Sequence, residues 1–261
     1  SGKTTLVLGL LRALARADTA VQPLKCGPDY IDPGFHAAAA GRVSFNLDSW
    51  AMRPALLDGL IRQAGADADL FVAEALMGLF DGVVGDGACG DGSSSGLAAR
   101  QGWPVLLVLD ISGQSQSAGA VAKGFASFRP DVRIAGVVLN KVASPRHEAL
   151  ARKGIEEAGL PVVGVLPRNA DLVLPERHLG LVQAGETAEL DRRLTALADF
   201  VESHCDIAAI RALAAPTRLP AAPDDAGLRP VLLEDAGLRP VLLEDAGLRP
   251  VVLEDAGLRP P

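Results

Sequence analysis

The residue types with the clearest chemical meaning stand at the start of the chain, in Ser1-Gly2-Lys3-Thr4-Thr5. They match the end of a phosphate-binding loop, whose pattern is Gly, four residues, Gly-Lys and then Ser or Thr. In such a loop the glycine lets the backbone approach a phosphate, the lysine reaches the β- and γ-phosphates, and the hydroxyl completes a Mg²⁺ shell. The apolar run that follows predicts a helix whose N-terminus would face the anion. The strand and the first glycine of the pattern would lie before residue 1.

A second polar stretch runs from Lys25 to His36. Its two carboxylates, Asp29 and Asp32, are three residues apart and suit Mg²⁺ coordination or substrate positioning near a phosphate loop. The alternative is that they are turn residues that cap the loop. Glu74 ends a later apolar segment, where a carboxylate is either a metal ligand or a solvated strand end. The 25–36 stretch and Glu74 are therefore candidates for the same site as the phosphate loop.

Apolar segments alternate with helical patterns over the first 203 residues. We expect strands at 19–25, 70–74, 104–110, 134–139 and 161–166. We expect helices at 4–17, 54–64, 96–101, 115–128, 146–158 and 186–203. The segments rich in glycine or proline predict loops and turns, at 26–35, 41–50 and 78–95. This alternation predicts an α/β fold with a mostly parallel sheet flanked by helices.

Polar residues stand at the carboxyl ends of four of the predicted strands, namely Lys25, Glu74, Asp110 and Asn140. Ligands of open parallel sheets bind at the carboxyl ends of the strands, so this shared position independently supports a nucleotide site. Asp110 could hold a Mg²⁺-bound water, or it could cap the loop that follows it. No pair of histidines has the spacing of metal ligands.

Composition narrows the class of protein. The 261 residues are 49% apolar and carry a formal net charge of −7 without a basic block, which argues against nucleic acid and anionic membrane as partners. No apolar run reaches the roughly 18 residues of a membrane span, and no signal peptide is visible. The cysteines, Cys26, Cys89 and Cys205, are far apart and form no disulfide framework. We therefore expect a cytoplasmic protein.

The C-terminal part of the chain has a different character. Residues 206–223 are rich in Ala and Pro and predict a linker. Residues 224–261 then repeat Asp-Ala-Gly-Leu-Arg-Pro every ten residues, starting at Asp225, Asp235, Asp245 and Asp255. A proline in every repeat forbids a long helix, so we expect a low-complexity, disordered tail. A short β-arm or a tail that docks a partner is the alternative.

These segments together resemble the synthetase half of cobyrinate or hydrogenobyrinate a,c-diamide synthase. The most specific matches are Lys-Cys-Gly-Pro-Asp-Tyr-Ile-Asp-Pro-Gly-Phe-His at 25–36 and Pro-Glu-Arg-His-Leu-Gly-Leu at 175–181. Both separate this family from cobyric acid synthase and dethiobiotin synthetase. Other matching segments follow in the family's order, at 1–11, 46–52, 74–82, 104–128 and 136–147. The resemblance implies a synthetase domain over 1–205, with a P-loop NTPase-like fold whose first strand is missing.

The resemblance also implies a chemistry, with ATP and Mg²⁺ as cofactors and a corrin-ring acid as substrate. ATP would phosphorylate the c-acetate and then the a-acetate of cobyrinate or hydrogenobyrinate. Ammonia from glutamine would displace each phosphate and leave an amide. The family's glutaminase half, with its nucleophilic cysteine and downstream histidine, has no counterpart in residues 1–261. The resemblance leaves a homodimer open.

Site roles follow from the resemblance, residue by residue. The implied catalytic residues are Lys3, Asp29, Asp32 and Glu74. The implied Mg²⁺ ligands are Thr4, Asp32 and Glu74. The nucleotide would contact Gly2, Lys3, Thr4, Thr5, Asn140, Pro167 and Arg168. The corrin substrate would contact Lys25, Tyr30, Ile31 and His36.

The chain also departs from the family. Ala75 and Leu76 stand where the family usually has Gly-Val, which matters if the exit of that strand needs a positive φ. Together with the shortened phosphate loop, this indicates an incomplete or damaged product of a bifunctional gene. Two other hypotheses stay open: a partition-type ATPase switch that binds protein partners, and a non-catalytic remnant that binds corrinoids.

Overall fold

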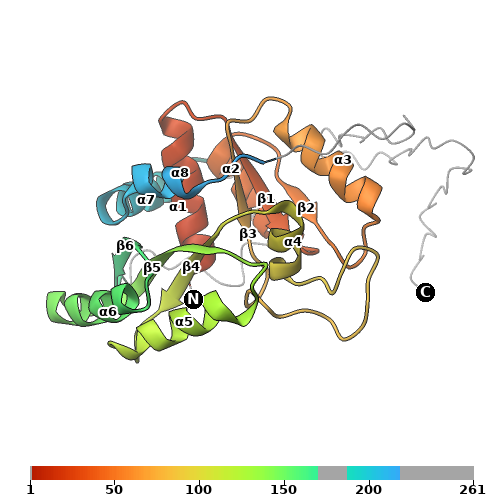
Figure 1. Ribbon diagram of the computed structural model, residues 1–261. Coiled ribbons are helices and arrows are strands. Elements are labelled where there is room, and N and C mark those ends of the chain that lie inside the picture. Colours follow the sequence, from red (N-terminus) through yellow and green to blue (C-terminus); the bar gives the residue numbers. More distant parts are fainter. Residues whose placement is uncertain (1, 170–186, 218–261) are drawn as a thin grey trace, which may run out of the picture.

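The computed structural model describes residues 2–169 and 187–217 (Figure 1). The motif at 175–181 and the repeats at 224–261 lie outside the described residues. No helix within the described ranges is both long and apolar enough to cross a membrane.

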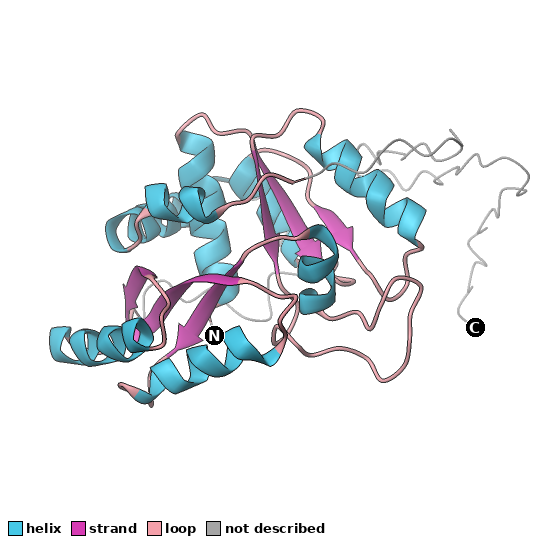
Figure 2. Cartoon of the chain, viewed as in Figure 1, coloured by secondary structure: helices cyan, strands magenta, loops and turns pink. Residues whose placement is uncertain are grey.

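The strands form two three-stranded sheets, and every pairing is parallel (Figures 1 and 2). The first sheet has the order β2-β1-β3, with β1 at Val21–Cys26, β2 at Phe45–Leu47 and β3 at Leu70–Glu74. The second has the order β4-β5-β6, with β4 at Val105–Asp110, β5 at Ile134–Val142 and β6 at Val162–Pro167. The predicted α/β class with parallel strands is confirmed.

Helices cover both faces of these sheets (Figure 2). They are α1 Lys3–Arg16, α2 Asp32–Ala40, α3 Pro54–Gly65, α4 Ser94–Gln101, α5 Ser117–Phe128, α6 Pro145–Glu157, α7 Thr187–His204 and α8 Ile207–Leu213. One apolar cluster joins α1, α2, α7 and α8 to one face of both sheets. A second lies between α5, α6 and the other face of β4–β6, and a third between α3, α4 and β1–β3. Because neighbouring strand residues enter opposite clusters, the strands are largely apolar up to their carboxyl ends.

An apolar cavity separates the two sheets. Among the described residues, β3 pairs only with β1 and β4 pairs only with β5, so the edges of β3 and β4 have no strand partner. The cavity measures about 240 Å³ and is lined by both edges and by residues of α1, α4 and α8. The single sheet expected from the sequence is therefore two sheets, joined through the helical layer.

Three elements differ from the sequence-based expectation. Helix α2 begins at Asp32, inside the segment predicted as a loop, because Pro33 is tolerated in the first turn of a helix. Strand β2 lies in the stretch predicted as turns, where only three residues pair with β1. The predicted linker was wrong at its start: residues 207–213 form α8, and Ile210 is buried against the main core.

Candidate functional site

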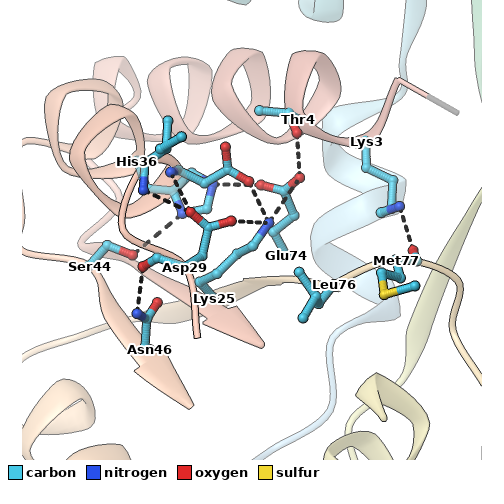
Figure 3. Close-up of polar contacts among 12 residues, drawn as sticks. Lys3, Thr4, Lys25, Asp29, His36, Ser44, Asn46, Glu74, Leu76 and Met77 are labelled. Atoms are coloured by element: carbon cyan, nitrogen blue, oxygen red, sulfur yellow. Dashed lines mark hydrogen bonds and ion pairs between the residues drawn. The ribbon is translucent and has the colours of Figure 1, made fainter. Parts of the chain in front are cut away.

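The start of α1 lies against the end of β3. Thr4 Oγ1 donates a hydrogen bond of 2.6 Å to Glu74 Oε1, and Lys3 Nζ donates one of 2.7 Å to the carbonyl of Met77 (Figure 3). Gly2 caps the helix in the left-handed region, at φ 85°, which suits glycine. The Gly-Lys-Thr segment and the predicted carboxylate Glu74 are thus one site at the carboxyl end of the strands. Thr5 is half-buried in the same turn.

Lys25, at the end of β1, lies at the centre of three carboxylates. Its Nζ is 2.5 Å from Asp32 Oδ2, 3.6 Å from Glu74 Oε1 and 3.7 Å from Asp29 Oδ2. The lysine side chain is only 4% exposed, so these carboxylates replace the water that it loses. The ammonium group thus faces the chain's own acids, and its contact with a substrate carboxylate stays a prediction.

His36, on α2, holds the other oxygen of Glu74. Its Nε2 lies 2.7 Å from Glu74 Oε2, and Ser44 Oγ is 3.4 Å from Nδ1. An ionised carboxylate only accepts hydrogen bonds, so Nε2 carries the proton of this contact. The histidine is fully buried, which does not support the predicted contact with substrate. Its geometry is that of a residue that orients Glu74.

Asp29 and its neighbours form the turn that leads into α2. Asp29 Oδ1 accepts hydrogen bonds from the backbone N–H groups of Ile31 and Asp32, at 2.8 and 3.0 Å. The turn-capping alternative is therefore correct for this oxygen, while Oδ2 faces Lys25. Tyr30 projects from the turn and is 90% exposed, whereas Ile31 packs against the core. Of this pair, only Tyr30 is placed to meet a large ligand.

The cluster is ionised in spite of its burial. Burial favours the neutral forms, but the charges of Glu74, Asp32 and Asp29 outweigh it and raise the pKa of Lys25. Burial likewise opposes ionisation of Glu74, and the contacts with His36, Lys25 and Thr4 outweigh it and lower that pKa. The backbone donors of the turn, helped by Lys25, lower the pKa of Asp29 in the same way. Glu74 and Asp29 therefore stay negative at neutral pH.

The donor set fits a Mg²⁺ ion as a partial shell. Thr4 and Glu74 place a hydroxyl and a carboxylate oxygen 2.6 Å apart, and Asp32 meets the same ammonium group as Glu74. Mg²⁺ usually takes only one or two carboxylates and completes its shell with water and phosphate. The described residues contain no group of three or more acidic, histidine or cysteine side chains arranged to cage a metal. The site thus suits a nucleotide-bound Mg²⁺ rather than a structural metal.

The ends of β5 and β6 complete this edge of the molecule. Asn140 lies so close to Gly2 that a Cβ on the glycine would be 2.3 Å from Asn140 Nδ2. Arg168, after Pro167, donates to the carbonyls of Lys141 and Ser112. Asp110 accepts a hydrogen bond from the N–H of Ser112, as in the capping alternative, and pairs with Lys141. These residues are together at one side of the phosphate loop, as the sequence predicted.

Sequence reasoning missed three supporting contacts. Asn46 Nδ2 donates to the carbonyl of Asp29 at 2.6 Å, Ser44 contacts His36, and the carbonyl of Met77 accepts from Lys3 (Figure 3). Met77, and not Ala75 or Leu76, takes the left-handed conformation, at φ 53°. The departure from Gly-Val at the strand exit is therefore accommodated. Only the matched segment at 46–52 could have pointed to Asn46.

The fold and site define a nucleotide-binding α/β domain with a phosphate loop at the start of α1. Residues 1–182 match the family model of the CobQ/CobB/MinD/ParA nucleotide binding domain, and the chain belongs to this family. It is 58% identical over 222 residues to the hydrogenobyrinate a,c-diamide synthase of Rhodobacter capsulatus, which covers 85% of this chain and 51% of that protein. The protein of the same name from Mesorhizobium japonicum is 55% identical over 217 residues, covering 83% and 49%. The chain spans about half the length of these relatives.

A ParA family ATPase from Chlorobium tepidum has a similar structure, with 16% identity and a TM-score of 0.42 over 76% of this chain and 92% of that one. This likeness is too distant to carry an argument about function.

Proposed function

We propose that the chain is the ATP-dependent synthetase part of a hydrogenobyrinate a,c-diamide synthase. The observation that carries the proposal is the buried junction of Thr4, Lys25 and Glu74, which joins the phosphate loop to the Asp29–Asp32 turn. The names of the relatives, at 50–58% identity, support the cobalt-free acid as substrate. The corrinoid substrate, glutamine as nitrogen source and Mg²⁺ are parts of this proposal.

The reaction would proceed in two steps at each acetate side chain. A carboxylate oxygen of the substrate attacks the γ-phosphorus of ATP, the bond to the ADP oxygen breaks, and an acyl phosphate forms. Ammonia then attacks the acyl carbon, phosphate leaves, and loss of a proton gives the amide. The first step brings two anions together, so its rate depends on groups that neutralise charge as it develops.

Residues of this chain have separate roles in that step. Lys3 would approach the β- and γ-phosphates, and Thr4 with Glu74 would hold Mg²⁺, which supplies charge neutralisation when bound. Asp32 and Lys25 would set the charge beside the attacking carboxylate. Tyr30, exposed on the turn between Asp29 and Asp32, would face the macrocycle.

Free ammonia offers the direct test, because it bypasses any need for glutamine. The chain, extended upstream by a strand and the first half of a phosphate loop, is incubated with hydrogenobyrinic acid, Mg·ATP and ammonium chloride. Mass spectrometry should detect conversion of one and then two carboxyl groups to amides, with one ADP for each. Corrinoid-independent ATP turnover without amide at any ammonium concentration would contradict the proposal and would favour a switch ATPase.

A further inference from the structure

Strand β5 carries a bulge at its carboxyl end. Asn140 pairs with Leu166 of β6 and Val142 pairs with the next residue, Pro167, so Lys141 is an extra residue on β5. Lys141 has a φ of 61°, in the left-handed region that non-glycine residues rarely adopt. Glycine is the usual residue at such a bulge, and bulges beside ligand sites redirect neighbouring side chains. A lysine in this conformation needs a reason that the backbone alone does not provide.

Side chains from the ends of β4 and β6 hold this bulge. Asp110 Oδ2 lies 2.6 Å from Lys141 Nζ. Arg168 donates to the carbonyl of Lys141 at 3.4 Å and to the carbonyl of Ser112 at 3.1 Å. The side chain of Asp110 is 28% exposed and that of Lys141 is 49% exposed. Ion pairs with this exposure contribute little to overall stability. The pair joins the carboxyl ends of β4 and β5, beside the phosphate loop. This position suggests a role in the ligand site.

The bulge determines how Asn140 presents its amide. The backbone N–H of Lys141 donates to Asn140 Oδ1 at 2.8 Å, and only the oxygen of the amide can accept that bond. The NH₂ group is therefore the end directed toward Gly2, as the close approach of Nδ2 to that glycine shows. If Lys141 relaxed to an ordinary strand conformation, its N–H would turn and Asn140 would lose this orientation.

We propose that Asp110, Lys141 and Arg168 form a bulge clamp, a set of positioning residues that aims Asn140 at the purine base of the bound nucleotide. The inference rests on the proposed function, since it assigns the base-recognition side of the same ATP site. Asn140 contacts the base, and Asp110 and Lys141 act through it. The clamp therefore governs recognition of the base and leaves binding of the phosphate chain unaffected.

The test compares two ligands that differ only in the nucleoside. Mg·ATP and magnesium tripolyphosphate are titrated into the millimolar range against the full chain, with affinities from NMR chemical shifts and unfolding temperatures from calorimetry. Asp110→Asn retains an acceptor for Ser112 but removes the charge that holds Lys141. Asp58→Asn is the matched control, because it removes a similarly exposed ion pair with Arg100, between α3 and α4.

We expect Asp110→Asn to raise the Kd of ATP about fivefold, the scale of a partly exposed ion pair of about 1 kcal/mol, and to leave that of tripolyphosphate unchanged. Asp58→Asn should change neither. Lys141→Gly separates positioning from stability, since glycine adopts the left-handed conformation freely. Lys141→Gly should bind ATP more weakly than the wild type while unfolding at no lower a temperature. Lys141→Arg, which keeps the ion pair with Asp110, should bind ATP more tightly than Lys141→Gly.

If Asp110→Asn lost affinity for ATP and for tripolyphosphate equally, Asp110 would have a general structural role and the bulge-clamp proposal would be wrong. ATP affinity equal to wild type in Asp110→Asn and Lys141→Gly would overturn it as well. Failure of the wild-type chain to bind ATP more tightly than tripolyphosphate would also overturn the clamp, whereas the proposed function is judged separately by amide formation in the upstream-extended chain.

Discussion

At the scale of single residues, Glu74 is the centre of the site. One of its oxygens accepts from Thr4 and the other contacts His36, while Lys25 lies 3.6 Å away. The side chain is 2% exposed, so these partners replace its hydration. A carboxylate with this many contacts can orient a hydroxyl, hold a cation and keep its charge at neutral pH.

Glu74→Gln tests the electrostatic role directly. The amide keeps the size of the side chain but removes one negative charge from beside the phosphate loop. We expect ammonia-dependent turnover of the upstream-extended chain to fall about 100-fold or more, the scale seen when one electrostatic stabiliser is lost. Corrinoid affinity should change little. Steady-state kinetics measure the effect, and Glu148→Gln, on the surface of α6, is the control. Unchanged ATP turnover in Glu74→Gln would show that Glu74 is only the end of a strand.

His36 can be tested through the stability of the fold. In His36→Phe the buried Oε2 of Glu74 loses its donor, and one buried acceptor atom left unsatisfied costs about 1–3 kcal/mol. His36→Gln can still donate to Glu74 and should lie closer to wild type. Urea unfolding monitored by circular dichroism measures both. Equal stability of the two variants would show that the contact with Glu74 contributes nothing.

Asp110 provides a prediction about pH. The hydrogen bond from Lys141, helped by those from Ser112 and by the charge of Lys141, lowers the pKa of Asp110 from 3.8 to about 2, against the opposing effect of burial. A pKa lowered by folding stabilises the folded state above about pH 4, and this contribution is lost as the pH falls toward 2. NMR titration of the carboxyl carbon should give a value near 2 in the wild type and a clearly higher one in Lys141→Met, where the hydrogen bonds from Ser112 remain. The same value in both would mean that the ion pair does not form in solution.

At the scale of elements, the carboxyl ends of β3 and β5 meet at the N-terminus of α1. Thr4 contacts Glu74 at the end of β3, and Gly2 lies beside Asn140 near the end of β5. The carboxyl ends of the two sheets are therefore joined through the start of α1. Between them, the unpaired edges of β3 and β4 face an apolar cavity of about 240 Å³. Unpaired edges accept strands readily, and this cavity has hydrogen-bonding groups on two sides.

A strand supplied to this cavity should stabilise the chain. We predict that an apolar strand fused before Ser1, followed by the first half of a phosphate loop, raises Tm by roughly 5 °C or more, as each kcal/mol is worth about 2–4 °C at this size. Backbone N–H groups of the added loop should also raise affinity for Mg·ATP. The control is a Gly/Ser extension of equal length. Calorimetry and titration showing no difference between the two extensions would refute the prediction.

At the scale of the whole molecule, none of the cysteines is placed to hydrolyse glutamine. Burial raises the pKa of Cys26 to about 11 and that of Cys205 to about 12, so neither is a thiolate at neutral pH. Cys89 lies in the glycine-rich loop after β3, outside any strand-to-helix turn. The chain spans about half the length of these relatives.

Residues 1–261 should therefore bind Mg·ATP weakly and form no amide from glutamine. Most of a phosphate cradle is backbone N–H, and Lys3 with Thr4 supplies only its end. Isothermal titration should give a Kd well above the micromolar range, and an assay for glutamate should detect none above the blank. Micromolar affinity would show that α1 alone forms a sufficient cradle; glutamate release that disappears in Cys89→Ser would identify an unexpected nucleophile.

Local patterns along the sequence were enough to predict the α/β class, most strand positions, and that the Gly-Lys-Thr segment and the 25–36 stretch lie near each other. These features depend on residues close in the chain: apolar runs form buried strands, and Gly-Lys-Thr opens a helix. Short or unusual elements were missed for the same reason. β2 has three residues, α2 begins at a proline-containing turn, and α8 lies in a segment rich in alanine.

Only the tertiary structure determined which predicted residues meet, and therefore what each one does. Lys25 and His36 had been predicted to contact substrate, but both are buried against Glu74, which is far away in the sequence. The bulge at Lys141 depends on Asp110 and Arg168 from neighbouring strands. Charge and hydrogen bonding act over a few ångströms in space, so a sequence pattern specifies the groups available, and the packing of strands decides their partners.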